Sequence, residues 1–171
     1  MHYLTAALQS GARRGSGPMH KIQVVRAKLH GLTVTDANLN YQGSITLDPL
    51  HCEAVGIYPL EFVDIWNRSS GARISTYVIY GEPGSRCCVL NGAAARTCQH
   101  GDQVIIAASA FIEPPALYDL DPKVLVFGED NRIDRELRYQ VRRSDQRDYD
   151  FKIVEGLEDD PFPVGQPVLT R

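Results

Sequence analysis

The sequence predicts a mainly β protein, arranged as a small barrel or sandwich with few helices. Short apolar runs, some with alternating apolar and polar residues, recur between residues 21 and 127. Turn-forming Gly, Pro, Asn, Asp and Ser residues separate these runs, and many short strands at close spacing are typical of such folds. The length of 171 residues fits one domain that buries a core of its own.

The predicted strands follow one another along the chain. Residues 21–35 alternate in part and include Gly31 near their end, and the run NYQGSITLD at residues 40–48 alternates around a Gly-Ser pair. A turn follows the strand at residues 62–67, and a Glu-Pro-Gly-Ser turn at 82–85 separates two strands. The remaining strands lie within residues 72–95, 101–112 and 123–130.

Two short helices are expected. Residues 48–56 have Asp48 as N-cap, Pro49 at the first helical position and Gly56 as a C-terminal stop. Residues 36–40, DANLN, predict one helical turn capped by Asp36.

Both ends of the chain differ from the middle. Residues 1–18 are rich in Gly, Ser and Arg and predict a flexible extension, with Met19 as a second candidate start. Arg13 and Arg14 follow the apolar run there, the reverse of the order in a secretory signal. Residues 19–137 form the predicted barrel domain, and residues 138–171 a charged, Pro-rich, partly disordered extension. Alternating Arg and acidic residues predict that part of residues 132–171 is helical.

Composition argues against several classes of protein. The formal net charge of -3 without a long basic block argues against a nucleic-acid surface, and no apolar run is long enough to span a bilayer. The scattered histidines lack metal-ligand spacing, so no metal is expected. No CxxC pair exists, which favours free thiols in a reducing cytoplasm. The four cysteines are Cys52, Cys87, Cys88 and Cys98.

The Gly43-Ser44 pair has two interpretations. By itself such a pair is most often a turn, but a glycine inside a strand also marks a bulge or a close backbone approach. A serine hydroxyl attacks the preceding carbonyl only where the backbone bends, and Gly43 permits angles that other residues resist.

Six segments in a fixed order decide between these interpretations, and together they resemble the aspartate 1-decarboxylase family over about residues 21–128. That family is pyruvoyl-dependent and makes β-alanine for pantothenate. The resemblance implies a double-psi β-barrel, a homotetramer, and an inactive proenzyme that cuts its own Gly43–Ser44 bond. The segments are AKLH (27–30), YQGS (41–44), DIWN (64–67), RISTY (73–77), NGAAA (91–95) and GDQVIIA (101–107).

The implied cleavage follows from the atoms. Attack of the Ser44 oxygen on the Gly43 carbonyl turns the amide into an ester. Loss of the Ser44 α-proton expels the Gly43 carboxylate and leaves dehydroalanine, whose hydrolysis releases ammonia and leaves a pyruvoyl group. By the resemblance, Thr76 stabilises the oxygen on which negative charge develops.

The resemblance also implies the chemistry of turnover. The amine of L-aspartate forms a Schiff base with the pyruvoyl group of Ser44, which accepts electrons as CO₂ departs, without pyridoxal phosphate or metal. Tyr77 then protonates the carbon, since a neutral tyrosine retains its proton at pH 7. Arg73 suits the remaining carboxylate through paired hydrogen bonds. Lys28, Thr76, Asn91, Gly92, Ala93 and Ala94 complete the expected substrate contacts, and Tyr41, Trp66 and His30 the pocket.

Other functions stay open at this stage. A self-processing N-terminal-serine hydrolase would also cut before Ser44 but keep a free amine there. A decarboxylase of a related amino acid and an inert barrel used for binding or assembly are further alternatives. The sequence also leaves open whether cleavage is spontaneous or needs a maturation factor.

Overall fold

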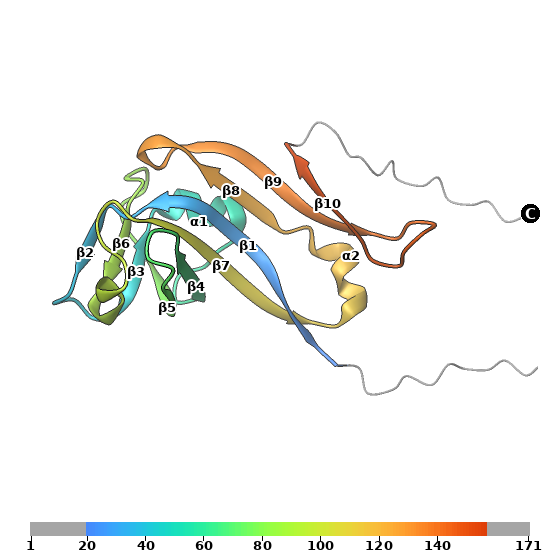
Figure 1. Ribbon diagram of the computed structural model, residues 1–171, viewed down its shortest axis with the longest axis horizontal. Helices are drawn as coiled ribbons and strands as arrows, with labels where there is room; N and C mark the ends of the chain where they lie inside the picture. The colour runs from blue at the N-terminus through green and yellow to red at the C-terminus, as the bar shows by residue number, and fades with distance from the viewer. Residues whose placement is uncertain (1–19, 157–171) are drawn as a thin grey trace, which may run out of the picture.

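The computed structural model describes residues 20–156, and these residues are mainly β-strand with short helices, as predicted (Figure 1). The predicted N-terminal extension at residues 1–18 and the end of the C-terminal one, residues 157–171, lie outside the described part. The elements are β1 (Ile22–Thr33), β2 (Asp36–Asn38), β3 (Ser44–Leu47), α1 (Pro49–Val55), β4 (Phe62–Asn67), β5 (Arg73–Tyr80), β6 (Cys88–Asn91), η1 (Gly92–Arg96), β7 (Gln103–Ile112), η2 (Pro114–Ala116), α2 (Leu117–Leu120), β8 (Lys123–Phe127), η3 (Glu129–Asn131), β9 (Ile133–Arg142) and β10 (Asp150–Glu155).

The strands form one continuous hydrogen-bonded series, β10-β9-β8-β1-β7-β4-β5-β3-β6-β2. Only Val34 and Thr35 separate β1 from β2, so the path from β1 through β7, β4, β5, β3 and β6 returns to the segment where it began. At this return the Thr35 N–H donates to the Cys88 carbonyl over 2.8 Å. A series of strands that comes back to its first segment agrees with the predicted barrel.

The core lies on one face of these strands because side chains alternate between the two faces of a sheet. Leu29 of β1, Ile65 of β4 and Ile106 of β7 are fully buried and belong to one hydrophobic cluster. Their sequence neighbours point to the opposite, outward face. Polar residues on these strands are therefore displayed outward on a rigid sheet.

The predicted helix at residues 48–56 is confirmed as α1. The Asp48 carboxylate caps it by accepting the Leu50 N–H, and Gly56 ends it with φ 76°. Asp48 also accepts the N–H groups of Gly84 and Arg86 in the turn before β6. Burial by itself raises the pKa of Asp48, but these backbone hydrogen bonds outweigh burial and hold the pKa below its ordinary value.

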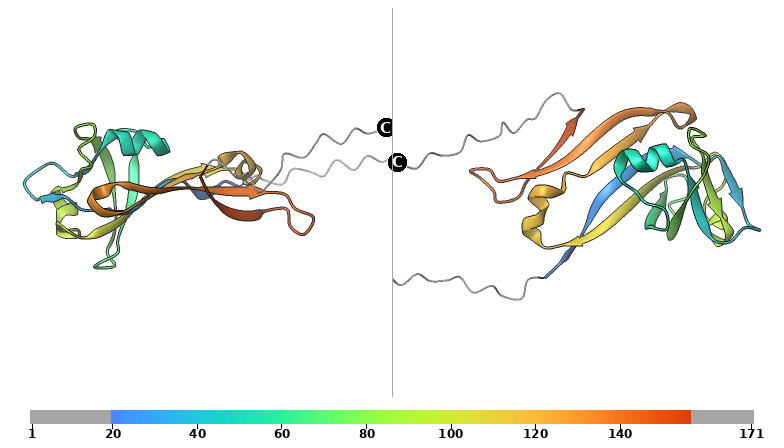
Figure 2. Two further views of the ribbon diagram at one scale, coloured as in Figure 1. Left: turned by 90° about the horizontal axis from the view of Figure 1, so that it is seen from above. Right: turned by 180° about the vertical axis from the view of Figure 1, so that it is seen from behind.

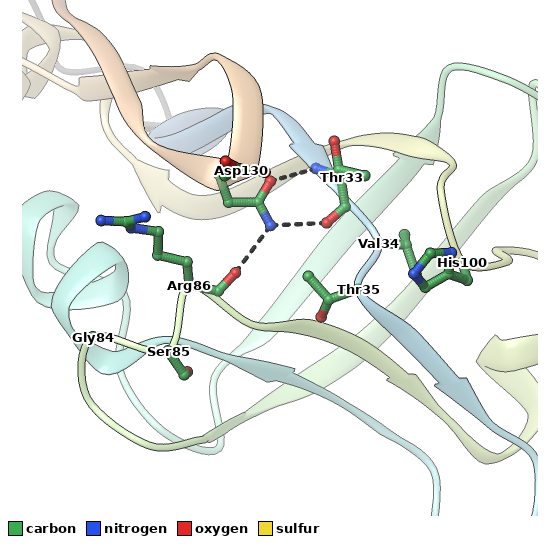
Figure 3. Close-up of a pocket in the computed structure, with 9 residues that line it drawn as sticks. Thr33, Val34, Thr35, Gly84, Ser85, Arg86, His100 and Asp130 are labelled. Atoms are coloured by element: carbon green, nitrogen blue, oxygen red, sulfur yellow. Dashed lines mark hydrogen bonds between the residues drawn. The ribbon is translucent and has the colours of Figure 1, made fainter.

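Buried Asn131 joins three segments that are distant in the sequence. Its Oδ1 accepts the Thr33 N–H over 2.7 Å, and its Nδ2 donates to the carbonyls of Thr33 and Arg86, both over 2.9 Å. The dashed lines beside Thr33 and Arg86 in Figure 3 mark these bonds, at one side of a cavity of about 460 Å³. Asn131 thus connects η3, the end of β1 and the turn before β6.

The helical turn predicted at residues 36–40 is wrong. Residues 36–38 form β2, which pairs in parallel with β6 and sets Asp36 opposite Val89. The Asp36 carboxylate accepts the Ala37 N–H. The chain continues from β1 in an extended conformation and pairs with β6. This pairing outweighs the helix-capping preference of Asp36, because an isolated helical turn makes few hydrogen bonds of its own.

The helix predicted within residues 132–171 is also wrong for residues 132–156, the part that the structure describes. β9 and β10 form an antiparallel hairpin, and the predicted domain boundary at 137/138 falls inside β9. Leu137, Tyr139 and Val141 alternate with charged and polar residues, and this period of two suits a strand paired with β8. Figure 2 shows the hairpin, in orange and red, in a thin extension beside the compact part of the chain.

All four cysteines are free, as the sequence predicted. Cys52, Cys88 and Cys98 are buried and Cys87 is partly exposed, and burial raises the pKa of the Cys52 thiol to about 12. Within residues 20–156, none of the helices has the length and apolar character needed to cross a membrane.

We expect Asn131→Ala to destabilise the fold by about 2–4 kcal/mol, because it leaves buried backbone groups of Thr33 and Arg86 without their partner. Urea unfolding followed by circular dichroism measures the change. The exposed loop residue Gln146 provides the control, since Gln146→Ala should alter stability by less than about 0.5 kcal/mol. Equal stability of the two variants would contradict the role of Asn131.

Candidate active site

The first residue of β3 is Ser44, and its hydroxyl is buried against a side-chain amide. Ser44 lies directly opposite Asn91 in the antiparallel pairing of β3 with β6, so both side chains point to the same side. Ser44 is 1% exposed and Asn91 3% exposed. Asn91 Nδ2 donates to Ser44 Oγ and to Thr46 Oγ1, each over 2.9 Å. The Ser44 oxygen is therefore held in place and shielded from solvent.

Gly92 presses against the backbone that precedes Ser44. It has φ 63°, and a Cβ placed on it would lie 2.9 Å from both Cα and N of Gly43 and 3.0 Å from the Tyr41 carbonyl oxygen. Side chains do not tolerate such approaches to backbone atoms, and the left-handed region also favours glycine. Gly92 thus lets the turn from β6 into η1 pack directly on the Gly43–Ser44 segment.

Gly43 itself does not show the unusual backbone angle that the sequence predicted. It is absent from the described glycines with positive φ, and a Cβ placed on it would meet no atom within 4 Å. Glycine is sterically required at position 92, because a side chain there would collide with the Gly43 backbone. The sequence assigned backbone distortion to Gly43 and a close approach to Gly92, and the structure shows a close approach at Gly92, against Gly43.

Tyr77 and Thr76 lie on β5, the other neighbour of β3. The parallel register pairs Ile45 with Val78, so its extension by one residue aligns Ser44 with Tyr77, and by two residues Gly43 with Thr76. Tyr77 therefore points to the side of Ser44, whereas Thr76 shares the side of Val78. The Tyr77 ring lies 6.1 Å from the ring of Phe62 on the outward face.

Arg73, Trp66 and His30 occupy one row on the outward face. Arg73 is opposite Trp66, and Ile105 of β7 is opposite both Trp66 and His30. The Arg73 guanidinium carbon is 5.3 Å from the centre of the Trp66 ring, in a cation–π contact. Arg73 shares the face of Tyr77 but precedes it by four residues, roughly 13 Å along the strand.

Lys28 lies two residues before His30 on the same face of β1. The Lys28 Nζ is 3.4 Å from the Tyr139 hydroxyl. Burial lowers the pKa of His30, and the positive charges of Lys28 and Arg68 lower it further. Both effects favour the neutral imidazole form of His30.

The predicted residues thus form two groups within one chain. The first group is built around the β3–β6 pair and contains Gly43, Ser44, Asn91 and Gly92. The register of β5 places Thr76 and Tyr77 beside this group. It is flanked by the exposed Tyr41 and by the start of η1, with Ala93 and Ala94. Lys28, His30, Trp66 and Arg73 form the second group, which we call the cationic row. Sequence reasoning missed Thr46, which Asn91 binds together with Ser44; its position two residues after Ser44 was the available signal.

No group of three or more His, Cys, Asp or Glu side chains within residues 20–156 is placed to hold a metal ion. Three cavities of about 460, 430 and 220 Å³ occur in this part of the chain. None of the three is lined by a predicted site residue.

A mainly β fold that buries a serine hydroxyl beside an amide, with cations on its outward surface, is compatible with a β-fold enzyme. The chain belongs to the aspartate decarboxylase family, because the sequence profile of that family, described as "Aspartate decarboxylase", matches residues 19–134. The match includes every site residue predicted from the sequence.

Individual relatives agree with this assignment. The chain is 66% identical to the aspartate 1-decarboxylase of Paramagnetospirillum magneticum over 78% of its own length and 75% of the relative's. It is 65% identical to that of Rhodospirillum centenum over 86% of its length and 97% of the relative's. It is 64% identical to that of Agrobacterium fabrum over 77% of its length and 85% of the relative's.

We expect Gly92→Ala to slow any rearrangement of the Gly43–Ser44 bond at least ~10-fold, because the added methyl displaces the Gly43 backbone and strains a left-handed residue. The measurement is the intact chain remaining with time on a denaturing gel. Gly43→Ala is the matched control, since a Cβ at Gly43 meets open space, and it should slow the rearrangement far less. The opposite order of effects would refute this packing argument.

Proposed function

We propose that this chain is a pyruvoyl-dependent decarboxylase that converts L-aspartate to β-alanine and CO₂ after cleaving its own Gly43–Ser44 bond. The observation that carries the proposal is the buried Ser44 hydroxyl, held by Asn91 and covered on the Gly43 side by Gly92. Relatives at 64–66% identity named aspartate 1-decarboxylase support the reaction. Its product would supply pantothenate synthesis.

The residues around Ser44 suit a reaction within the chain. In the hydrogen bond between Asn91 and Ser44, the amide is the donor and the Ser44 oxygen is the acceptor. The hydroxyl proton of Ser44 is therefore still available for transfer, and the oxygen retains a lone pair for attack. Burial limits the access of water, which would compete with the serine oxygen as the nucleophile. Thr76, aligned with Gly43 by register, is the proposed donor to the carbonyl oxygen of Gly43 during the attack.

The site fits a pyruvoyl group formed from Ser44. Because β3 begins at Ser44, the chain end created there stays paired with β6 and remains beside the Asn91 amide. When present, the group supplies a ketone that serves as the electron sink for decarboxylation. Asn91 would keep a hydrogen-bond donor at this position before and after cleavage.

Arg73 and Lys28 are the proposed partners of the negative charges of L-aspartate. The Trp66 ring supports the Arg73 guanidinium, and the planar edge of that group matches a carboxylate. Tyr77, on the side of Ser44, is the proposed proton donor to the substrate carbon. The start of η1, residues 91–94, is the proposed backbone contact for substrate.

We also propose that the active form is a homotetramer. Tyr58, Leu60, Phe62 and Phe111 are each at least 65% exposed, an unusual amount of apolar surface for an isolated chain. The cationic row and Ser44 lie apart within one chain, and a neighbouring copy would enclose the open outward face. The unpaired thiols fit a cytoplasmic location.

Mass spectrometry separates this proposal from a self-processing serine hydrolase. We expect purified wild-type protein to contain two fragments, the second lighter by one ammonia than a chain that begins with serine. A free serine amine at that end would favour the hydrolase, and a single uncut chain the inert barrel. Cleavage only after addition of cell extract would indicate a maturation factor. Comparison of L-aspartate with L-glutamate tests the preference for a related amino acid.

Ser44→Ala should leave the chain intact and without decarboxylase activity, because no hydroxyl is present to attack Gly43. Intact mass and β-alanine formation are the two readouts. Ser109→Ala, at a partly exposed serine of β7, is the control and should be cleaved like the wild type. Complete cleavage of Ser44→Ala would remove Ser44 from the mechanism.

Tyr77→Phe should be cleaved normally but lose turnover by roughly 10²–10⁴-fold, because only the proton donor is removed. Steady-state β-alanine formation, corrected for the cleaved fraction, measures the loss. Tyr58→Phe, at an exposed tyrosine, should retain wild-type turnover. Wild-type activity of Tyr77→Phe would exclude Tyr77 as the donor.

A further inference from the structure

The C-terminal hairpin places a tyrosine against a cation of the proposed site. The family match ends at residue 134, at the start of β9, so Tyr139 lies outside it. Tyr139 nevertheless contacts Lys28 of β1, which is a member of the cationic row. Part of the surroundings of Lys28 therefore comes from a segment beyond the matched domain.

Strand register explains how two residues so distant in sequence meet. Lys28 is opposite Val124 of β8, and Val124 is opposite Leu137 of β9. Tyr139 lies two residues after Leu137, on the same face of β9. The long lysine side chain crosses over β8 on this face and brings its ammonium to the tyrosine.

The contact is a hydrogen bond to the phenol oxygen. Lys28 Nζ is 3.4 Å from the Tyr139 hydroxyl oxygen, which accepts the bond, and 5.8 Å from the centre of the ring. Because the hydroxyl projects outward from the ring, an ammonium at these two distances lies beyond the hydroxyl edge and not over the ring face. The phenol oxygen is therefore the group that restrains the ammonium.

Tyr139 is itself held in place by the hairpin. Its ring meets that of Phe151 edge-on at 5.5 Å and 75°, and its N–H donates to the Pro122 carbonyl over 3.0 Å. Tyr139 is also paired with Ile153 across β9 and β10. A tyrosine fixed on both sides is a suitable support for a flexible lysine.

The chemistry of the partner matters because the proposed substrate is a dianion. A carboxylate beside Lys28 would neutralise the ammonium and compete with substrate, whereas a neutral phenol leaves its charge available. Within residues 20–156, the ion pairs involve other cations and none includes Lys28. The ammonium also keeps two further N–H donors.

We propose that Tyr139 is a positioning residue that orients the Lys28 ammonium for a carboxylate of the substrate. This inference rests on the proposed decarboxylase function and extends its site to the C-terminal hairpin. Tyr139 acts through Lys28, so its contribution disappears where Lys28 has no charge.

A double-mutant cycle tests this dependence with cleaved enzyme and L-aspartate. Tyr139→Leu should raise KM by roughly 5-fold with kcat nearly unchanged, and Tyr139→Phe should raise it similarly because it removes the hydroxyl that Lys28 contacts. In the Lys28→Met background, Tyr139→Leu should change KM less than about 2-fold. An equal KM increase in both backgrounds would overturn the proposal, since a purely structural role does not depend on the lysine charge.

Two controls address folding of the hairpin. Tyr149, in the loop of the hairpin, stacks on Tyr118 of α2 at 5.2 Å and has no contact with Lys28, so Tyr149→Leu should leave KM unchanged. The cleaved fraction of each variant reports whether the Ser44 region is intact. A KM increase in Tyr149→Leu equal to that in Tyr139→Leu would indicate general loosening of the hairpin and contradict the proposal.

A labelling experiment gives a result that does not depend on activity. N-hydroxysuccinimidyl acetate should acetylate Lys28 several-fold faster in Tyr139→Leu than in the wild type, with Lys123 as the internal reference. Equal rates would show that Tyr139 does not restrain the amine and would overturn the proposal. Wild-type protein that makes no β-alanine would contradict the decarboxylase function, whereas the labelling would still decide the role of Tyr139.

Discussion

The antiparallel pairing of β3 with β6 is the constraint on which the proposed chemistry depends. It sets Ser44 opposite Asn91, brings the amide to the serine oxygen, and carries the chain directly into Gly92. Gly92 then packs on the Gly43 backbone at a distance that a side chain would not allow. The proposed nucleophile, its hydrogen-bond donor and the bond before it are thus positioned by one strand pair.

The rest of the fold keeps this pair in place. β1 continues into β2, which pairs with β6 from the other side, and β5 pairs with β3. Asp48 and Asn131 bind backbone groups around the turn at Gly84–Arg86 from two directions. Buried backbone N–H and C=O groups need hydrogen-bond partners. Side chains such as these supply them in the irregular segments that connect the short strands, and so stabilise those segments.

The outward face of the long strands supplies charge. Lys28, His30, Trp66 and Arg73 come from three strands, yet they share a surface because rows of side chains cross the sheet through β7. Aromatic residues contact both named cations, the Trp66 ring beside Arg73 and the Tyr139 hydroxyl beside Lys28. Neutral groups restrain cations without cancelling their charge, which suits a surface proposed to receive a dianion.

Local patterns in the sequence determined much of this protein: the mainly β class, α1 with its Asp48 and Gly56 ends, the free thiols, and the six ordered segments that identify the family. These features depend on residues close together in the chain. The helical predictions at residues 36–40 and within residues 132–156 were wrong because strand pairing outweighed local propensity. Only the tertiary structure decided that Gly92 packs against Gly43, and that Tyr139 reaches Lys28. Those contacts join segments 49 and 111 residues apart, and no local pattern encodes which distant strands become neighbours.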